Sequence, residues 1–149
     1  MTTTIRPLEQ SDFFAWHELY SAYADFYETP LTDDRAMRVW AWLHNGEHVA
    51  RGIVALDDDG KLVGLAHVWE FERLLENDKG LYLEDLYVRP ENRKQGVATD
   101  LINSLKEGAA ENKIGVIRWI TAEGNETARK VYDKVAEKTD WVTYDIALG

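Results

Sequence analysis

The chain has 149 residues, of which 45% are hydrophobic, so it is long enough to bury one core and too short for two ordinary domains. It contains no cysteine, which excludes disulfides, thiolate metal sites and a cysteine nucleophile. With 27 acidic against 17 basic residues the formal net charge is −10, which disfavours nucleic acid as a partner and favours a cationic molecule. We therefore expect a single domain spanning residues 1–149.

Hydrophobic periodicity predicts strands alternating with helices along the whole chain. This order is typical of an α/β fold, with one mixed sheet that carries helices on both faces. In chain order the predicted elements are a strand over 3–6, a helix over 10–28, a helix capped at 32–34 and stopped by Asn45-Gly46, strands over 53–56 and 61–71, a strand over 81–88, a helix from Gly96 to about Asn112, a strand over 114–121, a helix from Asn125 to about Ala136 and a strand over 141–148.

The stretch from Asp85 to Ile102 joins an apolar strand, a basic glycine-containing turn and an amphipathic helix. The first N–H groups of a helix lack partners and carry the positive end of its dipole, so an anion is favoured near Gly96. Gly96 and Ala98 leave room for a close approach, while Arg93 and Lys94 add charge at the rim. The turn has neither the three glycines of a dinucleotide site nor the Gly-Lys-Ser/Thr of a Walker loop.

Two motifs resemble those of the GCN5-related N-acetyltransferases. Arg93-x-x-Gly96-x-Ala98 resembles motif A of that superfamily, Gln/Arg-x-x-Gly-x-Gly/Ala, and Asn125-x-x-Ala128-x-x-x-Tyr132 reproduces a second motif on a later helix. The closing run after Tyr132 looks most like the branch that contains the yeast Hpa2-type enzymes. It departs from the commoner Gly-Phe ending, with Trp141 in the place of the phenylalanine. The resemblance covers nearly the whole chain.

The resemblance implies a single mixed central sheet flanked by helices on both faces, with splayed strands 4 and 5. It implies acetyl-CoA as the donor co-substrate and no metal. The diphosphate would bind the backbone of motif A, and the pantetheine arm would pair with the fourth strand like an added strand. The residues expected to bind acetyl-CoA are Leu86, Tyr87, Val88, Arg93, Lys94, Gln95, Gly96, Val97, Ala98, Thr99, Asn125, Ala128 and Tyr132.

The implied reaction is direct transfer of the acetyl group to a primary amine in a ternary complex. A lysine-type amine has a reference pKa of about 10.4, so a general base is useful at neutral pH. We expect Glu84 to be that base, on the same strand face as Tyr82. The histone-acetylating branch has its base at the position of Tyr82, and a water chain is a third possibility. Tyr132 resembles the family's general acid, which protonates the departing CoA sulfur.

The acceptor side of the site is less well defined by the sequence. Tyr27 and Glu28 fall between the first two helices, where the family usually builds its acceptor pocket, and Tyr82 can reach the same groove. A polyamine, another small amine or a basic peptide agrees with the acidic charge. His67 is expected to be a packed or surface histidine, because no second histidine or carboxylate stands at metal-ligand spacing.

A second function class is a non-catalytic acyl-CoA-binding or regulatory module that kept the fold. Motif A is expected in both classes, whereas Tyr132 together with a groove carboxylate is needed only by an enzyme. The first residues show no basic region followed by an apolar run, and no stretch approaches the roughly eighteen apolar residues of a membrane span, so we expect a cytoplasmic protein without a membrane partner. The final predicted strand is free to pair with another chain, which predicts a homodimer.

Overall fold

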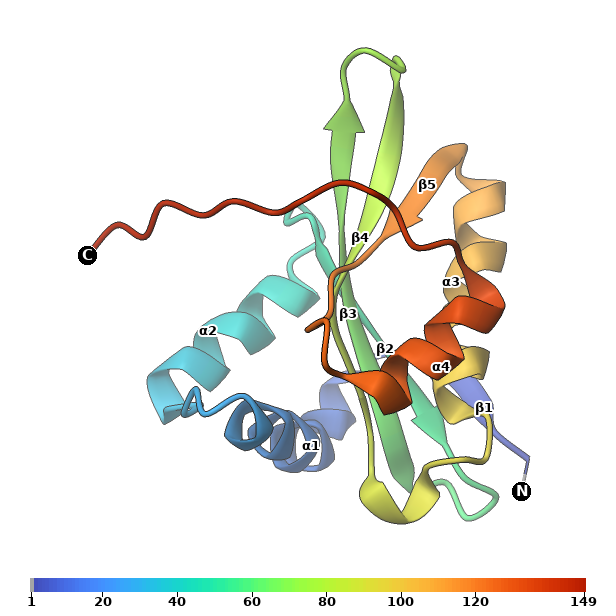
Figure 1. The fold of residues 1–149 in the computed structure, drawn as a ribbon. Helices are drawn as coiled ribbons and strands as arrows, with labels where there is room; N and C mark the ends of the chain where they lie inside the picture. The colour runs from blue at the N-terminus through green and yellow to red at the C-terminus, as the bar shows by residue number, and fades with distance from the viewer. Residues whose placement is uncertain (1) are drawn as a thin grey trace.

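The computed structural model describes residues 2–149, and a five-stranded sheet in the order β1-β2-β3-β4-β5 forms its centre (Figure 1). Neighbouring strands from β1 to β4 pair antiparallel, whereas β5 runs parallel to β4. The sheet is therefore mixed, as the sequence predicts. The strands are β1 (Thr4–Pro7), β2 (Ala50–Leu56), β3 (Leu62–Arg73), β4 (Asp78–Val88) and β5 (Ile114–Arg118).

Helices cover both faces of the sheet, α1 and α2 on one face and α3 and α4 on the other (Figure 1). They are α1 (Phe13–Phe26), α2 (Asp33–His44), α3 (Val97–Glu111) and α4 (Glu126–Val135), with 3₁₀ turns η1 (Gln10–Asp12) and η2 (Pro90–Asn92). Thr32 begins α2 as predicted, because its Oγ1 accepts a hydrogen bond from the Arg35 N–H at 3.3 Å. Within residues 2–149 no helix has the length and apolar character needed to cross a membrane.

Each face of the sheet has its own apolar core. On the α1 and α2 face, Trp16, Leu19 and Trp40 pack against Val54 and Leu65. On the other face, buried residues of α3 pack against β3 and β4, and α4 adds Tyr132 and Val135 at the margin: Val63, Leu81, Leu83, Val97, Leu101, Ile102 and Leu105 belong to this core. Because β3 contributes to both cores, it fixes the two helical layers relative to one another.

β4 changes its pairing on both sides near its middle. Opposite β3, His67 faces Asp85 and Val68 faces Leu83, so Glu84 is an extra residue that forms a β-bulge. Opposite β5, the ladder reaches only Tyr82. From residue 83 to 88 the outer edge of β4 has no strand beside it, which confirms the predicted splay of strands 4 and 5.

The strand predicted over residues 141–148 is wrong for the single chain. After α4 the backbone is extended but forms no ladder, and in Figure 1 it crosses in front of β5 and β4 and then leaves the body of the molecule. Alternating apolar side chains give this segment the composition of a strand, but a strand also needs a neighbour for its N–H and C=O groups. The fifth strand likewise ends at Arg118, short of the predicted 121.

Candidate active site

The start of α3 presents backbone N–H donors that can bind an anion, and we call this turn the anion seat. Gly96 precedes the helix with φ 82°, in the left-handed region, and a Cβ placed there would meet no neighbour. Glycine is therefore selected by backbone conformation rather than by crowding. No side chain among the described residues caps this end, so the first-turn N–H groups of buried Val97 and half-buried Ala98 and Thr99 remain suited to an anion.

The basic side chains near this turn are partly engaged by the protein itself. Arg93 donates from Nε to the Val88 carbonyl at 3.1 Å. Arg89 donates to a carboxylate oxygen of Glu18 at 2.8 Å. Lys94 and Gln95 are exposed in the turn. The anion seat consequently depends on backbone N–H groups, with Lys94 supplying charge at its rim.

The three predicted contacts on β4 lie where that strand has lost its neighbour. Leu86 and Val88 pack toward the α3 core, whereas Tyr87 packs toward α1 and α2, with the Arg93 guanidinium 5.5 Å from its ring centre. The backbone groups on the open edge can accept an extended ligand as an added strand. This edge leads from the start of α3 toward the point where β4 and β5 part.

The second motif lies on α4. Asn125 precedes the helix without capping it, and its Nδ2 donates to Thr121 Oγ1 at 3.3 Å. Ala128 and Tyr132 follow as half-buried residues, and the Tyr132 ring meets Trp119 edge-on at 5.3 Å between centroids. Burial, and then the nearby Tyr27, raise the pKa of Tyr132. Its hydroxyl is protonated at neutral pH and can act as a proton donor.

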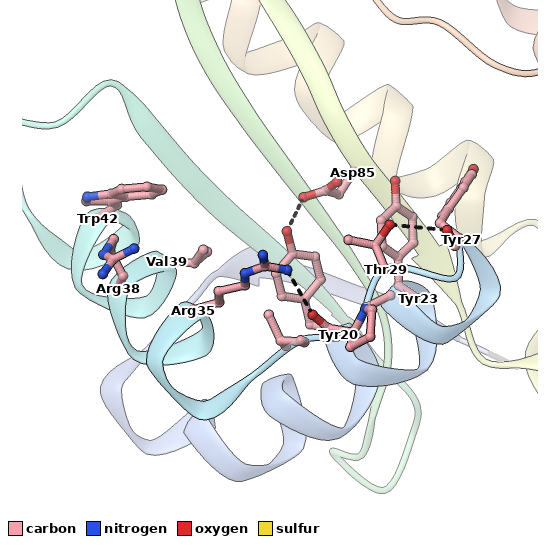
Figure 2. Close-up of a pocket in the computed structure, with 12 residues that line it drawn as sticks. Tyr20, Tyr23, Tyr27, Thr29, Arg35, Arg38, Val39, Trp42 and Asp85 are labelled. Atoms are coloured by element: carbon pink, nitrogen blue, oxygen red, sulfur yellow. Dashed lines mark hydrogen bonds between the residues drawn. The ribbon is translucent and has the colours of Figure 1, made fainter. Parts of the chain in front are cut away.

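A cavity of about 390 Å³ lies between α1, α2 and β4 (Figure 2). Of the three acceptor-side residues expected from sequence, only Tyr27 lines it. Glu28 is exposed, and Tyr82 packs at a tilt against Trp69 outside the cavity, with 5.3 Å between ring centroids. The polar and aromatic residues that line the cavity are Tyr20, Tyr23 and Tyr27 of α1 and its end, Arg35, Arg38 and Trp42 of α2, and Asp85 of β4.

Asp85 is a carboxylate held inside this cavity by donors from two elements. Its Oδ2 accepts from the Tyr20 hydroxyl at 2.9 Å and lies 2.8 Å from Nδ1 of His67. Trp16 Nε1 donates to Nε2 of the same imidazole at 2.9 Å. An indole N–H only donates, so Nδ1 of His67 carries the proton and donates to Asp85. His67 is thus a buried partner of a carboxylate, which sharpens the expectation of a packed histidine.

These contacts keep Asp85 ionised although its side chain is only 13% exposed. Burial raises the pKa of Asp85, but hydrogen bonds from His67, Tyr20 and Tyr23 outweigh that effect and hold the pKa below its ordinary value. Burial, followed by the charge of Asp85, raises the pKa of Tyr20 and Tyr23, so both hydroxyls remain donors. The cavity therefore contains a fixed negative charge surrounded by aromatic rings.

Glu84, the expected base, occupies the bulge next to Asp85. It is exposed, and its Oε2 accepts from Trp69 Nε1 at 3.1 Å. The Tyr82 ring packs at a tilt against the same indole, and both residues lie near the point where β4 and β5 part. Sequence reasoning missed Asp85, Tyr20 and Tyr23. Within residues 2–149 no cluster of three or more histidine, aspartate or glutamate side chains could hold a metal ion.

A mixed sheet whose fourth and fifth strands part beside a glycine-started helix, with a protonated tyrosine on the following helix, has the features of a CoA-dependent acyltransferase. Residues 15–136 match the model of the Acetyltransferase (GNAT) family, and the chain belongs to that family. It is an acetyltransferase, and enzymes of this family use acetyl-CoA. The membership inferred from the two motifs is thereby confirmed.

Curated relatives are N-acetyltransferases. The chain is 30% identical to the D-amino-acid N-acetyltransferase HPA3 of Saccharomyces cerevisiae (strain ATCC 204508 / S288c) over 141 residues, which are 94% of this chain and 88% of the relative. It is 33% identical to the thialysine N-epsilon-acetyltransferase of Caenorhabditis elegans over 69 residues, 43% of each protein.

Solved structures share the fold. A ribosomal-protein-alanine N-acetyltransferase from Brucella melitensis biovar Abortus 2308 superposes with a TM-score of 0.85 at 24% identity, covering 99% of this chain and 100% of the other. The aminoglycoside enzyme AAC(6')-Iy, in complex with the bisubstrate analogue CoA-S-monomethyl-acetylneamine, gives a TM-score of 0.84 at 19% identity over the whole of both chains. These likenesses establish the architecture.

Replacing Gly96 tests whether the anion seat at the start of α3 binds acetyl-CoA. We expect Gly96→Ala to lower the free energy of unfolding by about 1–2 kcal/mol, because a Cβ is strained at positive φ, and to weaken acetyl-CoA binding in calorimetry. Gly108→Ala is the matched control, since Gly108 lies within α3 with open space around it. That variant should keep its affinity and gain about 0.5–1 kcal/mol of stability. Equal affinity in both variants would argue against the seat.

The ionisation of Asp85 predicts a pH dependence of stability. The folded pKa of Asp85 lies below the unfolded value of about 3.9. Its contribution is therefore present above that value and is lost as the pH falls through the folded pKa. In urea titrations between about pH 5 and pH 3, the wild type should lose more unfolding free energy than Asp85→Asn. Identical losses would contradict the assigned charge.

Proposed function

We propose that this acetyltransferase moves an acetyl group from acetyl-CoA to the primary amine of a small molecule by direct transfer in a ternary complex. The observation that carries the proposal is the ionised carboxylate of Asp85 in a cavity lined by tyrosines. A carboxylate attracts an ammonium group, and aromatic rings add cation–π attraction. Tyr27 lines this cavity and is near enough to Tyr132 to raise the pKa of that residue.

Asp85 suits binding better than proton abstraction. A carboxylate whose pKa is held below its ordinary value is a weak base, and its lone pairs already accept bonds from His67 and Tyr20. Glu84 directly precedes Asp85, in the bulge, and is exposed to water. In this scheme Asp85 anchors the amine, and Glu84 takes the proton, directly or through a water chain.

The remaining step concerns the departing thiolate. The neutral amine nitrogen attacks the thioester carbonyl, the carbon–sulfur bond breaks, and the CoA sulfur needs a proton. Tyr132 supplies it, because its raised pKa keeps the hydroxyl protonated and its ring packs against the same core as Leu86 and Val88 of β4. Backbone donors at Gly96–Thr99 hold the diphosphate, while Leu86 and Val88 pair with the pantetheine arm.

The cavity favours an acceptor that carries a carboxylate as well as an amine. Arg35 and Arg38 of α2 line the side opposite Asp85, so the cavity has one anionic and one cationic wall (Figure 2). Guanidinium groups bind carboxylates, whereas they repel the additional charges of a polyamine or basic peptide. A free amino acid meets both requirements. The name of the yeast relative, a D-amino-acid N-acetyltransferase, supports this class.

We also propose that the protein acts in the cytoplasm as a single-domain homodimer, without nucleic acid or membrane as a partner. The formal charge of −10 opposes binding to polyanions.

A thiol-release assay tests the reaction and the acceptor class together. With acetyl-CoA as the donor, a panel of D- and L-amino acids, polyamines, aminoglycosides and lysine peptides should give the highest kcat/KM with amino acids. Acetyl-CoA binding without release on any acceptor would instead support a non-catalytic module. A preference for polyamines would overturn the role given to the arginines.

Tyr132→Phe removes the proposed acid while keeping the ring against Trp119. We expect kcat to fall about 100-fold, the lower range for a lost general acid, while the Kd for acetyl-CoA changes little. Calorimetry and steady-state kinetics measure the two quantities. Unchanged turnover would remove Tyr132 from the mechanism.

The neighbouring carboxylates should respond differently to neutralisation. Asp85→Asn should raise the KM for the amine about 10- to 100-fold, as expected for a lost charged hydrogen bond, with little effect on the KM for acetyl-CoA. Glu84→Gln should instead lower kcat with little effect on the KM for the amine. An unaltered kcat in Glu84→Gln would assign the proton transfer to water alone or to another group.

A further inference from the structure

The imidazole of His67 lies between two hydrogen-bond partners that favour opposite protonation states. Its Nδ1 lies 2.8 Å from Oδ2 of Asp85, and its Nε2 accepts from Trp16 Nε1 at 2.9 Å. His67 is buried and Trp16 is fully buried. A carboxylate beside an imidazole ordinarily favours the doubly protonated ring, because the two opposite charges attract. Binding of that second proton would cancel the charge that the pair presents to the cavity.

The indole of Trp16 opposes the second proton by its geometry. An indole N–H donates and does not accept, so Nε2 must keep its lone pair for the indole. An imidazolium would place two N–H groups against each other at 2.9 Å in the interior, and neither would have an acceptor. The rings of Phe13, Tyr20 and Trp40 pack around the indole and hold it in this orientation. The hydrogen bond therefore favours the neutral imidazole.

Other charged and titratable side chains surround the pair from three elements. They are Tyr20 and Tyr23 of α1, Glu84 of β4, and Arg35 and Arg38 of α2 (Figure 2). From β2, the uncharged Gly52 lies opposite His67. Burial, and then the charge of Asp85, raise the pKa of both tyrosines, so their hydroxyls stay neutral. Asp85 is the ionised group in direct contact with the imidazole, and the pair carries one net negative charge while His67 is neutral.

We propose that Trp16 is a positioning residue for the amine: its hydrogen bond keeps His67 neutral, so that Asp85 retains its net charge for an ammonium group at acidic as well as neutral pH. An imidazolium would instead cancel this charge and repel the ammonium group. Trp16 is fully buried and acts on the acceptor through His67 and Asp85. This inference rests on the proposed binding of the amine by Asp85 and adds the residue that sets the charge of that site.

Histidine ¹⁵N spectra of the free protein test the protonation state without any acceptor. The chain has 4 histidines, and the signals of His67 are those that disappear in His67→Asn. Between about pH 8 and pH 5.5, a range in which an imidazole in water titrates, Nε2 of His67 in the wild type should stay unprotonated. In Trp16→Phe it should gain a proton. A wild-type Nε2 that becomes protonated would overturn the proposal whether or not the variant folds, and so would a folded variant whose Nε2 stays unprotonated.

The pH dependence of the KM for the amine tests the consequence for binding. The acceptor is the amino acid that gives the highest kcat/KM in the thiol-release panel. Between about pH 7 and pH 5.5 its KM should change little in the wild type, because Asp85 stays ionised. In Trp16→Phe it should rise about 10-fold, because an imidazole with the reference pKa of about 6.5 is about 90% protonated at pH 5.5.

Two control variants separate the charge of His67 from the packing of the core. Trp40→Phe removes an indole from the same core, 4.8 Å from Trp16 between ring centroids, and should leave the KM independent of pH. Trp16→Phe/His67→Asn should also lose the pH dependence, because an asparagine side chain gains no proton in this range.

A KM in Trp16→Phe that does not depend on pH, or a KM that rises at acidic pH in either control, would overturn the proposal. If no amino acid in the panel is acetylated, the proposed function fails. The ¹⁵N spectra still decide in that case whether Trp16 holds His67 neutral, so the two failures are distinguishable.

Discussion

The site depends on one irregularity in β4, the bulge at Glu84 next to the end of its ladder with β5. Before the bulge, Leu81 and Leu83 face the α3 core, and after it Leu86 and Val88 do so, because the extra residue shifts the alternation by one. The same shift directs Asp85 toward α1. Without the bulge, regular alternation would direct Asp85 into the α3 core and would turn Leu86 and Val88 away from that core.

Placing Asp85 toward α1 requires donors, because an unpaired buried carboxylate is strongly destabilising. His67 comes from the neighbouring strand and Tyr20 from α1, so one carboxylate connects the sheet to the helical layer that forms the cavity. Trp16 fixes the imidazole from its other side. These hydrogen bonds keep Asp85 ionised. The network that offsets the cost of burying the carboxylate therefore also preserves the negative charge that attracts a cationic ligand.

Membership of a family that uses acetyl-CoA was predictable from the sequence because the motifs that indicate it are local. Gly96 and Tyr132 belong to short motifs in which spacing along a helix determines geometry, and the predicted helices and the sheet class agree with the structure. The cavity that contains Asp85 was not predictable in the same way. Asp85 is 65 residues from Tyr20 and 18 from His67, so only the folded chain brings these three together. The strand predicted over residues 141–148 is wrong for a related reason, since the alternating pattern describes a strand but not the neighbouring strand that it needs.

The short length of β5 has two consequences for the molecule. Because β5 covers β4 only from Lys79 to Tyr82, the rest of the β4 edge stays open on the side where an extended donor can pair. Because no later strand of the same chain covers β5, its outer edge is also open. Open edges invite further strand pairing, and a protein must occupy or block them to avoid uncontrolled association. The first edge has the geometry to pair with an extended donor arm, and the second is left short because β5 has only five residues.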